Sequence, residues 1–304
     1  MTKCINKTVV VCWWSGGITS AVACYLAIKL FGKENVRVIM IDTKNEHKDT
    51  YRFLKDCEKW YGVKIERIWN PKYDSIVDVW YKFQGMNFAF GAICSSELKR
   101  AVRKQWQKEN NYDYQVFGYE FGKKEFNRAS GMSLNYPDAK AIYPLLMYGY
   151  DKPDCIKFVE DAGIEIPVAY KLGLHNNNCL QTGCVQGGLS YWYLFSKINP
   201  WGYLIMGIIE HKISELKGKP VTINKDQSKA AKQSGMWNVF LLPNPNYPNH
   251  KCLFDMKGIN KPPKPLIDCN GFCGINDLSE KSETENEIFR QDSTEYDNQQ
   301  LSIF

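Results

Sequence analysis

The residues best suited to chemistry are Ser-Gly-Gly-Ile-Thr-Ser at positions 15–20, which follow an apolar run at 9–14. Two adjacent glycines let the backbone approach an anion closely, and the N–H groups of the turn and of a following helix then point at it. An ordinary strand-to-helix loop with a serine cap has the same local pattern. We interpret the pattern as a nucleotide-binding loop made of Ser15, Gly16, Gly17, Ile18, Thr19 and Ser20, in which Ser15 and Ser20 are also candidates for catalysis.

Two pairs of cysteines form a second candidate site. Cys179 and Cys184, and then Cys269 and Cys273, each stand close together in sequence that is rich in glycine and asparagine. Two such pairs can supply four thiolates to a Zn²⁺ ion or to an iron–sulfur cluster. Four ordinary reduced cysteines are the alternative, and the spacing does not choose between the metals. Three further cysteines lie in apolar, periodic stretches and are expected in the core: Cys12, Cys24 and Cys57.

An alternation of strands and helices must position these residues. We expect strands at 8–14, 36–41, 64–69, 114–118 and 141–145, and helices at 20–31, 47–61, 73–83, 96–110 and 151–162. This order is typical of an α/β fold with a doubly wound, mostly parallel sheet. Ligands of such sheets bind at the carboxyl ends of the strands, where residues 15–20, Asp42 and Gly118 would lie together.

The chain is expected to have three parts. Residues 1–174 form the nucleotide-binding domain, and residues 175–275 form a helical, cysteine-containing part packed on it. Residues 276–304 are polar and acidic, which predicts a disordered tail. The aromatic cluster in the second part is expected in the core, with stacking on nucleic acid as the alternative. Its members are Tyr191, Trp192, Tyr193, Phe195 and Trp201.

Charge is unevenly distributed. The 304-residue chain has a formal net charge of +6, but residues 276–304 contain eight acidic and two basic residues, so the preceding residues carry +12. The positive charge of residues 1–275 suits an anionic partner such as a nucleotide or nucleic acid. A solvated lysine-rich surface without any partner is the alternative explanation. No apolar run has the length that spans a bilayer, and no signal peptide precedes the eleven cysteines. We therefore expect a cytoplasmic protein with reduced thiols and no membrane partner.

Several short motifs together resemble one known family, the phosphoadenosine phosphosulfate (PAPS) reductase family of the PP-loop adenine nucleotide α-hydrolases. The resemblance covers residues 7–275 and is carried by Ile41-Asp42-Thr43 followed by Glu46, Thr50 and Tyr51; by Cys94-Ser95-Ser96-Glu97-Leu98-Lys99; by Gly118 to Arg128; by Tyr143-Pro144-Leu145; and by Tyr170 to Gly173 followed by Cys179 and Cys184. These motifs are specific for the family but not for its substrate.

The resemblance implies a parallel sheet that binds ATP, or the sulfated nucleotide PAPS, through the loop at 15–20. In the ATP-using branch a substrate oxygen attacks the α-phosphate, pyrophosphate leaves, and sulfur or nitrogen then displaces the adenylated oxygen. The phosphate charge requires donors and a cation, for which we expect Mg²⁺. Lys99 and Arg128 are candidate catalytic phosphate contacts, and Gly118 is expected beside the nucleotide. Asp42 is expected to contact ribose, base or metal, unless it only caps the strand end.

Two departures from the family pattern affect these expectations. Many family loops carry Lys-Asp where this chain has Ile18-Thr19, which removes a phosphate-facing cation and a carboxylate. The segment Cys273-Gly274-Ile275 resembles the C-terminal nucleophile motif of PAPS reductases, but Asn276 replaces its histidine. Because a thiolate nucleophile needs a basic partner and none stands nearby in the sequence, we prefer the metal interpretation for Cys273.

The last five residues, Gln-Leu-Ser-Ile-Phe, resemble the peptide by which bacterial proteins bind the sliding clamp. Its anchors would be Gln300, Leu301, Ile303 and Phe304 at the end of a flexible acidic linker. The leading hypothesis is therefore an ATP-cleaving enzyme that modifies DNA by sulfur insertion or base modification, similar to the DNA phosphorothioation enzymes with their iron–sulfur cluster. The alternatives are a PAPS reductase of sulfate assimilation and a non-catalytic nucleotide-binding adaptor at the replication clamp.

Overall fold

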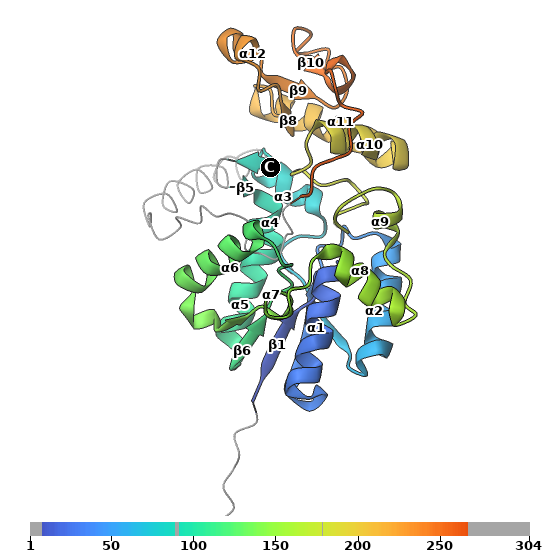
Figure 1. The fold of residues 1–304 in the computed structure, drawn as a ribbon. Coiled ribbons are helices and arrows are strands. Elements are labelled where there is room, and N and C mark those ends of the chain that lie inside the picture. Colours follow the sequence, from blue (N-terminus) through green and yellow to red (C-terminus); the bar gives the residue numbers. More distant parts are fainter. Residues whose placement is uncertain (1–7, 89–90, 178, 267–304) are drawn as a thin grey trace, which may run out of the picture. The chain divides into compact units, whose positions relative to one another are not determined.

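A computed structural model describes residues 8–88, 91–177 and 179–266, and the fold of these residues is shown in Figure 1. The expected tail at 276–304, with its clamp-binding peptide, and the cysteines at 269 and 273 lie outside the described residues. Within the described part of the chain, no helix is long and apolar enough to cross a membrane.

A five-stranded parallel sheet forms the centre of the first part. Its strands are β1 (Val10–Trp13), β2 (Val36–Ile41), β3 (Ile65–Ile68), β6 (Tyr114–Val116) and β7 (Ala141–Ile142). The spatial order is β3-β2-β1-β6-β7, and every neighbouring pair is parallel. The order reverses direction at β1, which places a topological switch point between β1 and β6. The predicted doubly wound parallel sheet is confirmed.

Both faces of this sheet are covered, as the side chains of β1 show. Val10 and Cys12 join the core under α1 (Ile18–Phe31), α2 (Lys48–Tyr61) and α8 (Lys152–Asp161). Val11 and Trp13 join the core under α5 (Ala101–Glu109) and α6 (Lys123–Asn135). Such alternation on a strand buried on both sides explains why β1 reads as a continuous apolar run. The expected core cysteines Cys12, Cys24 and Cys57 are all buried. Burial raises the pKa of the Cys57 thiol to about 12, so this thiol is protonated and inert.

The helices lie close to the predicted ranges. They are α1 (Ile18–Phe31), α2 (Lys48–Tyr61), α3 (Ile76–Lys82), α4 (Ile93–Ser95), α5 (Ala101–Glu109), α6 (Lys123–Asn135), α7 (Pro144–Tyr148), α8 (Lys152–Asp161), α9 (Val168–Lys171), α10 (Leu189–Ile198), α11 (Pro200–Lys217) and α12 (Lys229–Ser234). Capping boxes at Ser75 and Asp151 fix where α3 and α8 begin, because each carboxylate three residues later bonds back to the cap.

Three local predictions need correction. The helix expected at 96–110 begins with a π-helical turn, Ser96–Arg100, before α5 continues it. The strand expected at 141–145 ends after Ile142, because Pro144 begins α7. Residues 175–266 are not only helical, since β8 (Asn224–Lys225), β9 (Asn238–Phe240) and β10 (Lys251–Cys252) form a small mixed sheet in the order β10-β9-β8.

The aromatic cluster on α10 packs in the core as expected. Tyr191, Trp192 and Phe195 are buried, and they share one core with Trp80 of α3. The core therefore joins residues before and after position 174. Two members of the cluster depart from this expectation, since Tyr193 is only half-buried and Trp201 of α11 is 74% exposed.

Glu210 connects α11 to the small sheet. Its fully buried carboxylate accepts the backbone N–H groups of Ile223 and Leu241 at 2.8 and 2.6 Å. Burial raises the pKa of this carboxyl to about 8, because the two hydrogen bonds only partly offset desolvation of the charge.

This pKa predicts a stability that depends on pH. Because the folded protein keeps the Glu210 proton up to about pH 8, while the unfolded chain releases it near the ordinary value of 4.5, Glu210 stabilises the fold less as pH rises between these values. Glu210→Gln should remove this pH-dependent contribution to the free energy of unfolding, which changes by up to about 1.4 kcal/mol per pH unit. Urea unfolding of both proteins across this range measures it. Glu215→Gln, at an exposed ion pair on the same helix, is the control and should keep the wild-type slope. Parallel curves for Glu210→Gln and the wild type would contradict the prediction.

Candidate functional site

The glycine loop, defined as residues 15–20, joins β1 to α1. Gly16 has a φ of 86°, and a Cβ built on it would lie 2.8 Å from Thr50 Cγ2, so both conformation and space require glycine. The Ser20 hydroxyl accepts from the N–H and the hydroxyl of Ser15 at 3.1 and 3.0 Å and donates to the Gly17 carbonyl. These bonds hold the loop around the N-terminus of α1, whose first N–H groups have no acceptor within the helix and suit an anion.

Gly118, at the end of β6, forms one wall of the glycine loop. A Cβ at this position would lie 2.6 Å from Ser20 Cα and 2.7 Å from Ser20 N. Only glycine therefore lets the chain after β6 lie against the first turn of α1. The structure thus brings Gly118 and the glycine loop together at the switch point between β1 and β6.

Two residues from the second half of the chain form hydrogen bonds with the glycine loop. The Ile18 N–H donates to the Tyr170 hydroxyl at 3.1 Å, and the Asn177 amide donates to the Gly16 carbonyl at 2.9 Å and to Thr50 Oγ1 at 3.1 Å. The sequence did not assign these roles. Tyr170 stood within a family segment, but Asn177 lies in an asparagine run that has the composition of an ordinary loop.

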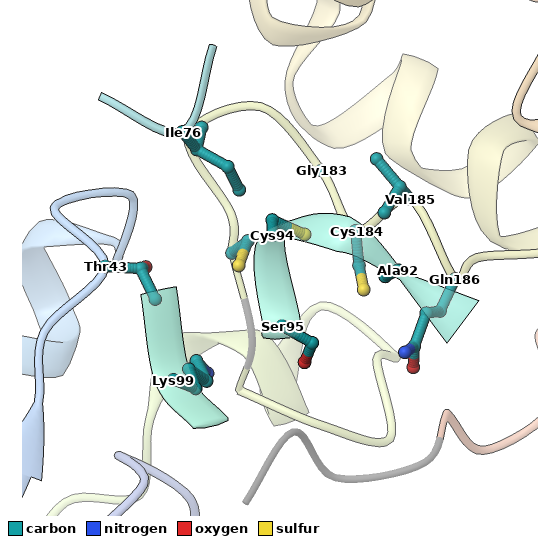
Figure 2. A pocket seen from close by; sticks show the side chains of 11 residues that line it. Thr43, Ile76, Ala92, Cys94, Ser95, Lys99, Gly183, Cys184, Val185 and Gln186 are labelled. Carbon is teal, nitrogen blue, oxygen red and sulfur yellow. The ribbon is translucent and has the colours of Figure 1, made fainter. Parts of the chain in front are cut away.

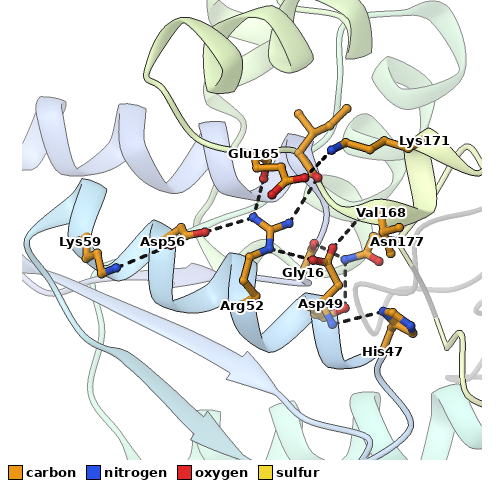
Figure 3. Close-up of polar contacts among 12 residues, drawn as sticks. Gly16, His47, Asp49, Arg52, Asp56, Lys59, Glu165, Val168, Lys171 and Asn177 are labelled. Atoms are coloured by element: carbon orange, nitrogen blue, oxygen red, sulfur yellow. Dashed lines mark hydrogen bonds and ion pairs between the residues drawn. The ribbon is translucent and has the colours of Figure 1, made fainter.

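A brace on α2 positions the segment that carries Tyr170 (Figure 3). Asp49 accepts from Arg52 Nε and from the Val168 N–H, both at 2.7 Å, and Arg52 also donates to the Glu165 carbonyl. Partial burial opposes ionisation of Asp49, but the bonds from Arg52 and Val168 outweigh it and lower the pKa of the carboxyl. The brace therefore stays charged at neutral pH and fixes residues 165–168 against α2.

Asp42 lies at the end of β2, buried, with its partners inside the protein. It accepts from the Lys44 N–H at 2.8 Å, from the Tyr51 hydroxyl at 3.0 Å and from the Arg67 guanidinium. Burial, and next the Asp42 charge, raise the pKa of Tyr51, which therefore remains a donor. These contacts fit the alternative expected for Asp42, in which it only caps the end of its strand. They also hold Arg67 at the carboxyl edge of the sheet.

A pocket lies beside this edge, and we call it the thiol pocket (Figure 2). Its lining includes Cys94, Lys99, Cys179 and Cys184, with Thr43 from the end of β2. Cys94 and Lys99 come from the helical run 93–100, and the other two cysteines come from the loop before α10. The structure thus brings the candidate residues Lys99, Cys179 and Cys184 together and adds Cys94, which the sequence analysis treated only as part of a motif.

Burial shifts the pKa of several groups in and beside the thiol pocket. Burial raises the pKa of the Cys184 thiol and, with the nearby Glu46 charge, that of Cys179. Burial also raises the pKa of Glu46, although Lys99 and a 3.0 Å bond from the Thr43 hydroxyl oppose this. In the described part of the chain no partner reaches the buried Glu46 Oε2. The pocket therefore combines a buried lysine and three thiols, and the buried acid Glu46 interacts electrostatically with Lys99 and Cys179 of its lining.

The proposed metal centre stays a prediction. Among residues 8–88, 91–177 and 179–266, no group of three or more Cys, His, Asp or Glu side chains is arranged to hold a metal ion. Cys269 and Cys273 lie outside these ranges. The three thiols of the pocket have the right chemistry for Zn²⁺ or an iron–sulfur cluster, but not the arrangement of a ligand set.

Arg128 lies on α6, near the end of β6. It is buried, pairs with Glu125 Oε2 at 3.0 Å, and its guanidinium stands 4.3 Å from the centre of the Tyr119 ring. Tyr119 directly follows Gly118, so Arg128 is anchored beside that wall of the glycine loop. Its contact with phosphate remains a prediction.

Parts of the chain are similar to known proteins. Residues 9–115 match the model of the phosphoadenosine phosphosulfate reductase domain. An uncharacterized protein of Methanocaldococcus jannaschii is 32% identical over 130 residues, which are 41% of this chain and 25% of that protein. The chain thus spans about a quarter of the length of that curated relative. Phosphoadenylyl-sulfate (PAPS) reductase from Candida auris, solved as a phosphate complex, matches with a TM-score of 0.43 and 14% identity over 58% of this chain and 83% of that chain.

The parallel sheet, with its switch point beside the glycine loop, defines the first part as a doubly wound α/β domain. The match over residues 9–115 shows that this part of the chain is similar to the phosphoadenosine phosphosulfate reductase domain. Over these residues the family resemblance inferred from the sequence is confirmed.

Gly118→Ala tests the wall of the loop. The added methyl group meets backbone atoms of Ser20 at 2.6 Å, so the loop and β6 must separate, and adenine nucleotide affinity should fall about tenfold or more. Isothermal titration with ATP and with PAPS measures the change. Gly131→Ala on α6 is the matched control, because nothing lies within 4 Å of its Cβ position, and it should leave affinity unchanged. Equal affinities for the two variants would contradict the role of Gly118.

Proposed function

We propose that this chain binds ATP at the glycine loop, cleaves it at the α-phosphate with release of pyrophosphate, and uses the adenylated intermediate to modify nucleic acid. The observation that carries the proposal is the loop itself, which Ser20, Gly118 and Asn177 hold open around the N-terminus of α1 at the switch point of the sheet. Helix N-termini at such points bind phosphate groups.

The proposed reaction has two displacements. An oxygen of the substrate attacks the α-phosphorus, the bond to the bridging oxygen breaks, and pyrophosphate leaves. A sulfur or nitrogen nucleophile then attacks the carbon that bears the adenylated oxygen, and AMP leaves with that oxygen. Backbone N–H groups of the loop would stabilise the phosphate charge, with Lys99 and Arg128 as candidate cations.

Mg²⁺ belongs to the proposal as the ion that accompanies ATP. Asp42 is a poor ligand for it, because Arg67, Tyr51 and the Lys44 N–H already engage its oxygens. The substitution of Ile18-Thr19 for Lys-Asp also leaves the side chains at these two loop positions without charge. No protein ligand is therefore assigned to the ion, and no step depends on one.

DNA is the proposed substrate because the chain before residue 276 carries a net charge of +12. The thiol pocket supports sulfur chemistry, since it gathers three thiols beside the edge at which the loop opens. A Zn²⁺ ion or an iron–sulfur cluster at Cys179, Cys184, Cys269 and Cys273 is retained as part of the proposal. We also retain a cytoplasmic location.

Two other functions have specific support. The family match favours a PAPS reductase, which would release sulfite with a thiol such as Cys273 as nucleophile. The uncharged Ile18-Thr19 pair favours a nucleotide-binding adaptor without turnover. Sulfite release from PAPS that Cys273→Ser abolishes would support the reductase. Tight ATP binding with no AMP formed in the presence of DNA and a sulfur donor would support the adaptor.

The loss of the Ser20 hydroxyl tests the proposed reaction. Ser20→Ala removes the bonds that order Ser15 and the Gly17 carbonyl, so pyrophosphate release from ATP in the presence of DNA and a sulfur donor should fall about 10- to 100-fold. Ser130→Ala, an exposed serine on α6, should retain the wild-type rate. Wild-type protein that releases neither AMP nor pyrophosphate with any donor would overturn the proposal.

The clamp proposal is tested through the end of the chain. Deletion of residues 300–304, which include Gln300, Leu301, Ile303 and Phe304, should abolish capture of a bacterial sliding clamp in a pull-down while ATP affinity is unchanged. Replacement of Ser302 by Ala leaves the apolar anchors intact and should retain capture. Equal capture by the deletion variant and the full chain would contradict the clamp motif.

A further inference from the structure

We propose that the carboxyl edge of the sheet is a binding surface for single-stranded nucleic acid, whose bases stack on Trp69, Phe121 and Phe126 and whose phosphates are held by Lys44, Lys123 and Lys124. We call these six residues the aromatic–lysine edge. The inference rests on the proposed function and specifies the form of its substrate.

The first observation is the position of three exposed aromatic rings. Trp69 directly follows β3 and is 49% exposed, while Phe121 and Phe126 follow β6 and are 56% and 60% exposed. A single exposed ring on a soluble protein is ordinary. Here all three follow the carboxyl ends of strands, at the edge of the parallel sheet where the glycine loop also opens.

The second observation is their spacing. The order β3-β2-β1-β6 puts β1 and its glycine loop between the two aromatic positions. Neighbouring strands are about 4.8 Å apart, so β3 and β6 are separated by roughly 14 Å. An oligonucleotide that contacts both Trp69 and Phe121 must therefore pass over the strand that leads into the ATP-binding loop. This arrangement would bring an intervening nucleotide close to the α-phosphate.

The third observation is the charge beside each ring. The Lys44 ammonium lies 5.9 Å from the centre of the Trp69 ring, and the exposed Lys44 adopts a φ of 57° in a turn that Asp42 holds through its N–H. Lys123 and Lys124 are exposed in the first turn of α6, between Phe121 and Phe126. The helix dipole disfavours cations at this end, and a bound phosphate group would offset that cost.

Rings that alternate with lysines favour a single strand over a duplex. An unpaired base can present its flat face to a ring, whereas paired bases in a duplex are covered by their neighbours. Stacking of this kind tolerates any base sequence, and the lysines add an affinity that depends on salt.

The test uses the full chain and fluorescein-labelled 12-nucleotide oligomers in fluorescence anisotropy. Single-stranded DNA, single-stranded RNA and duplex DNA are compared at two salt concentrations. We expect tighter binding of single strands than of the duplex. The two single-stranded arms show which sugar is preferred. Trp69→Ala and Phe121→Ala should each weaken single-strand binding about tenfold, and Lys123→Ala should reduce its salt dependence.

Controls come from exposed residues of the same types elsewhere. Trp201→Ala on α11 and Lys232→Ala on α12 should bind single strands as the wild type does. Equal losses in Trp69→Ala and Trp201→Ala, a preference for the duplex, or no binding by the wild type would overturn the inference.

Titration of each edge variant with ATP separates the two proposals. Wild-type ATP affinity combined with lost oligonucleotide binding supports the aromatic–lysine edge as a substrate surface distinct from the glycine loop. If the wild type binds ATP but no oligonucleotide, the edge proposal fails while nucleotide binding stands. If it binds oligonucleotides through the edge but no ATP, the proposed function fails and the surface remains.

Discussion

The close approach of two backbones at Gly118 is the constraint on which the site depends. The end of β6 lies so near the first turn of α1 that a single methyl group would separate them. This contact fixes the chain after β6 against the N-terminus of α1 at the switch point of the sheet. The sheet order, the two cores and the lengths of β1 and β6 all serve to hold these two segments together.

The surroundings of the glycine loop are completed by parts of the chain that are far apart in sequence. Tyr170 and Asn177 reach the glycine loop across more than 150 residues, and the Asp49–Arg52 brace holds the segment from which they come. The second half of the chain is therefore part of the loop's architecture. On the neighbouring side, the thiol pocket joins the end of β2 to the loop before α10. The chain after α9 thus contributes both to the surroundings of the glycine loop, through Asn177, and to the thiol pocket, through Cys179 and Cys184.

The sequence predicted those features that depend on local patterns. Apolar periodicity indicated the strands and helices of the sheet, and the two glycines with flanking serines indicated the loop. The sequence could not give the partners of Asp42, because a carboxylate after a strand can cap a turn, bind a ligand or pair with an arginine on the neighbouring strand. It also missed Asn177 and the convergence of Cys94 with Cys179 and Cys184, since no sequence spacing reports a contact between distant loops. The small sheet escaped prediction because β8, β9 and β10 contain only two or three residues each.

The π-helical turn at Ser96–Arg100 lets one helical run pack its two ends in two different cores. Leu98, before the end of this turn, packs in the core with Trp80 and Trp192, whereas Trp106, two turns later, packs on the sheet with Trp13. A π turn contains one residue more than an α turn and so rotates everything after it by about a quarter of a circle. The extra residue therefore turns the side chains after residue 100 toward a different core from the one that Leu98 joins. The helix can thereby present Lys99 to the thiol pocket and still return its aromatic face to the sheet.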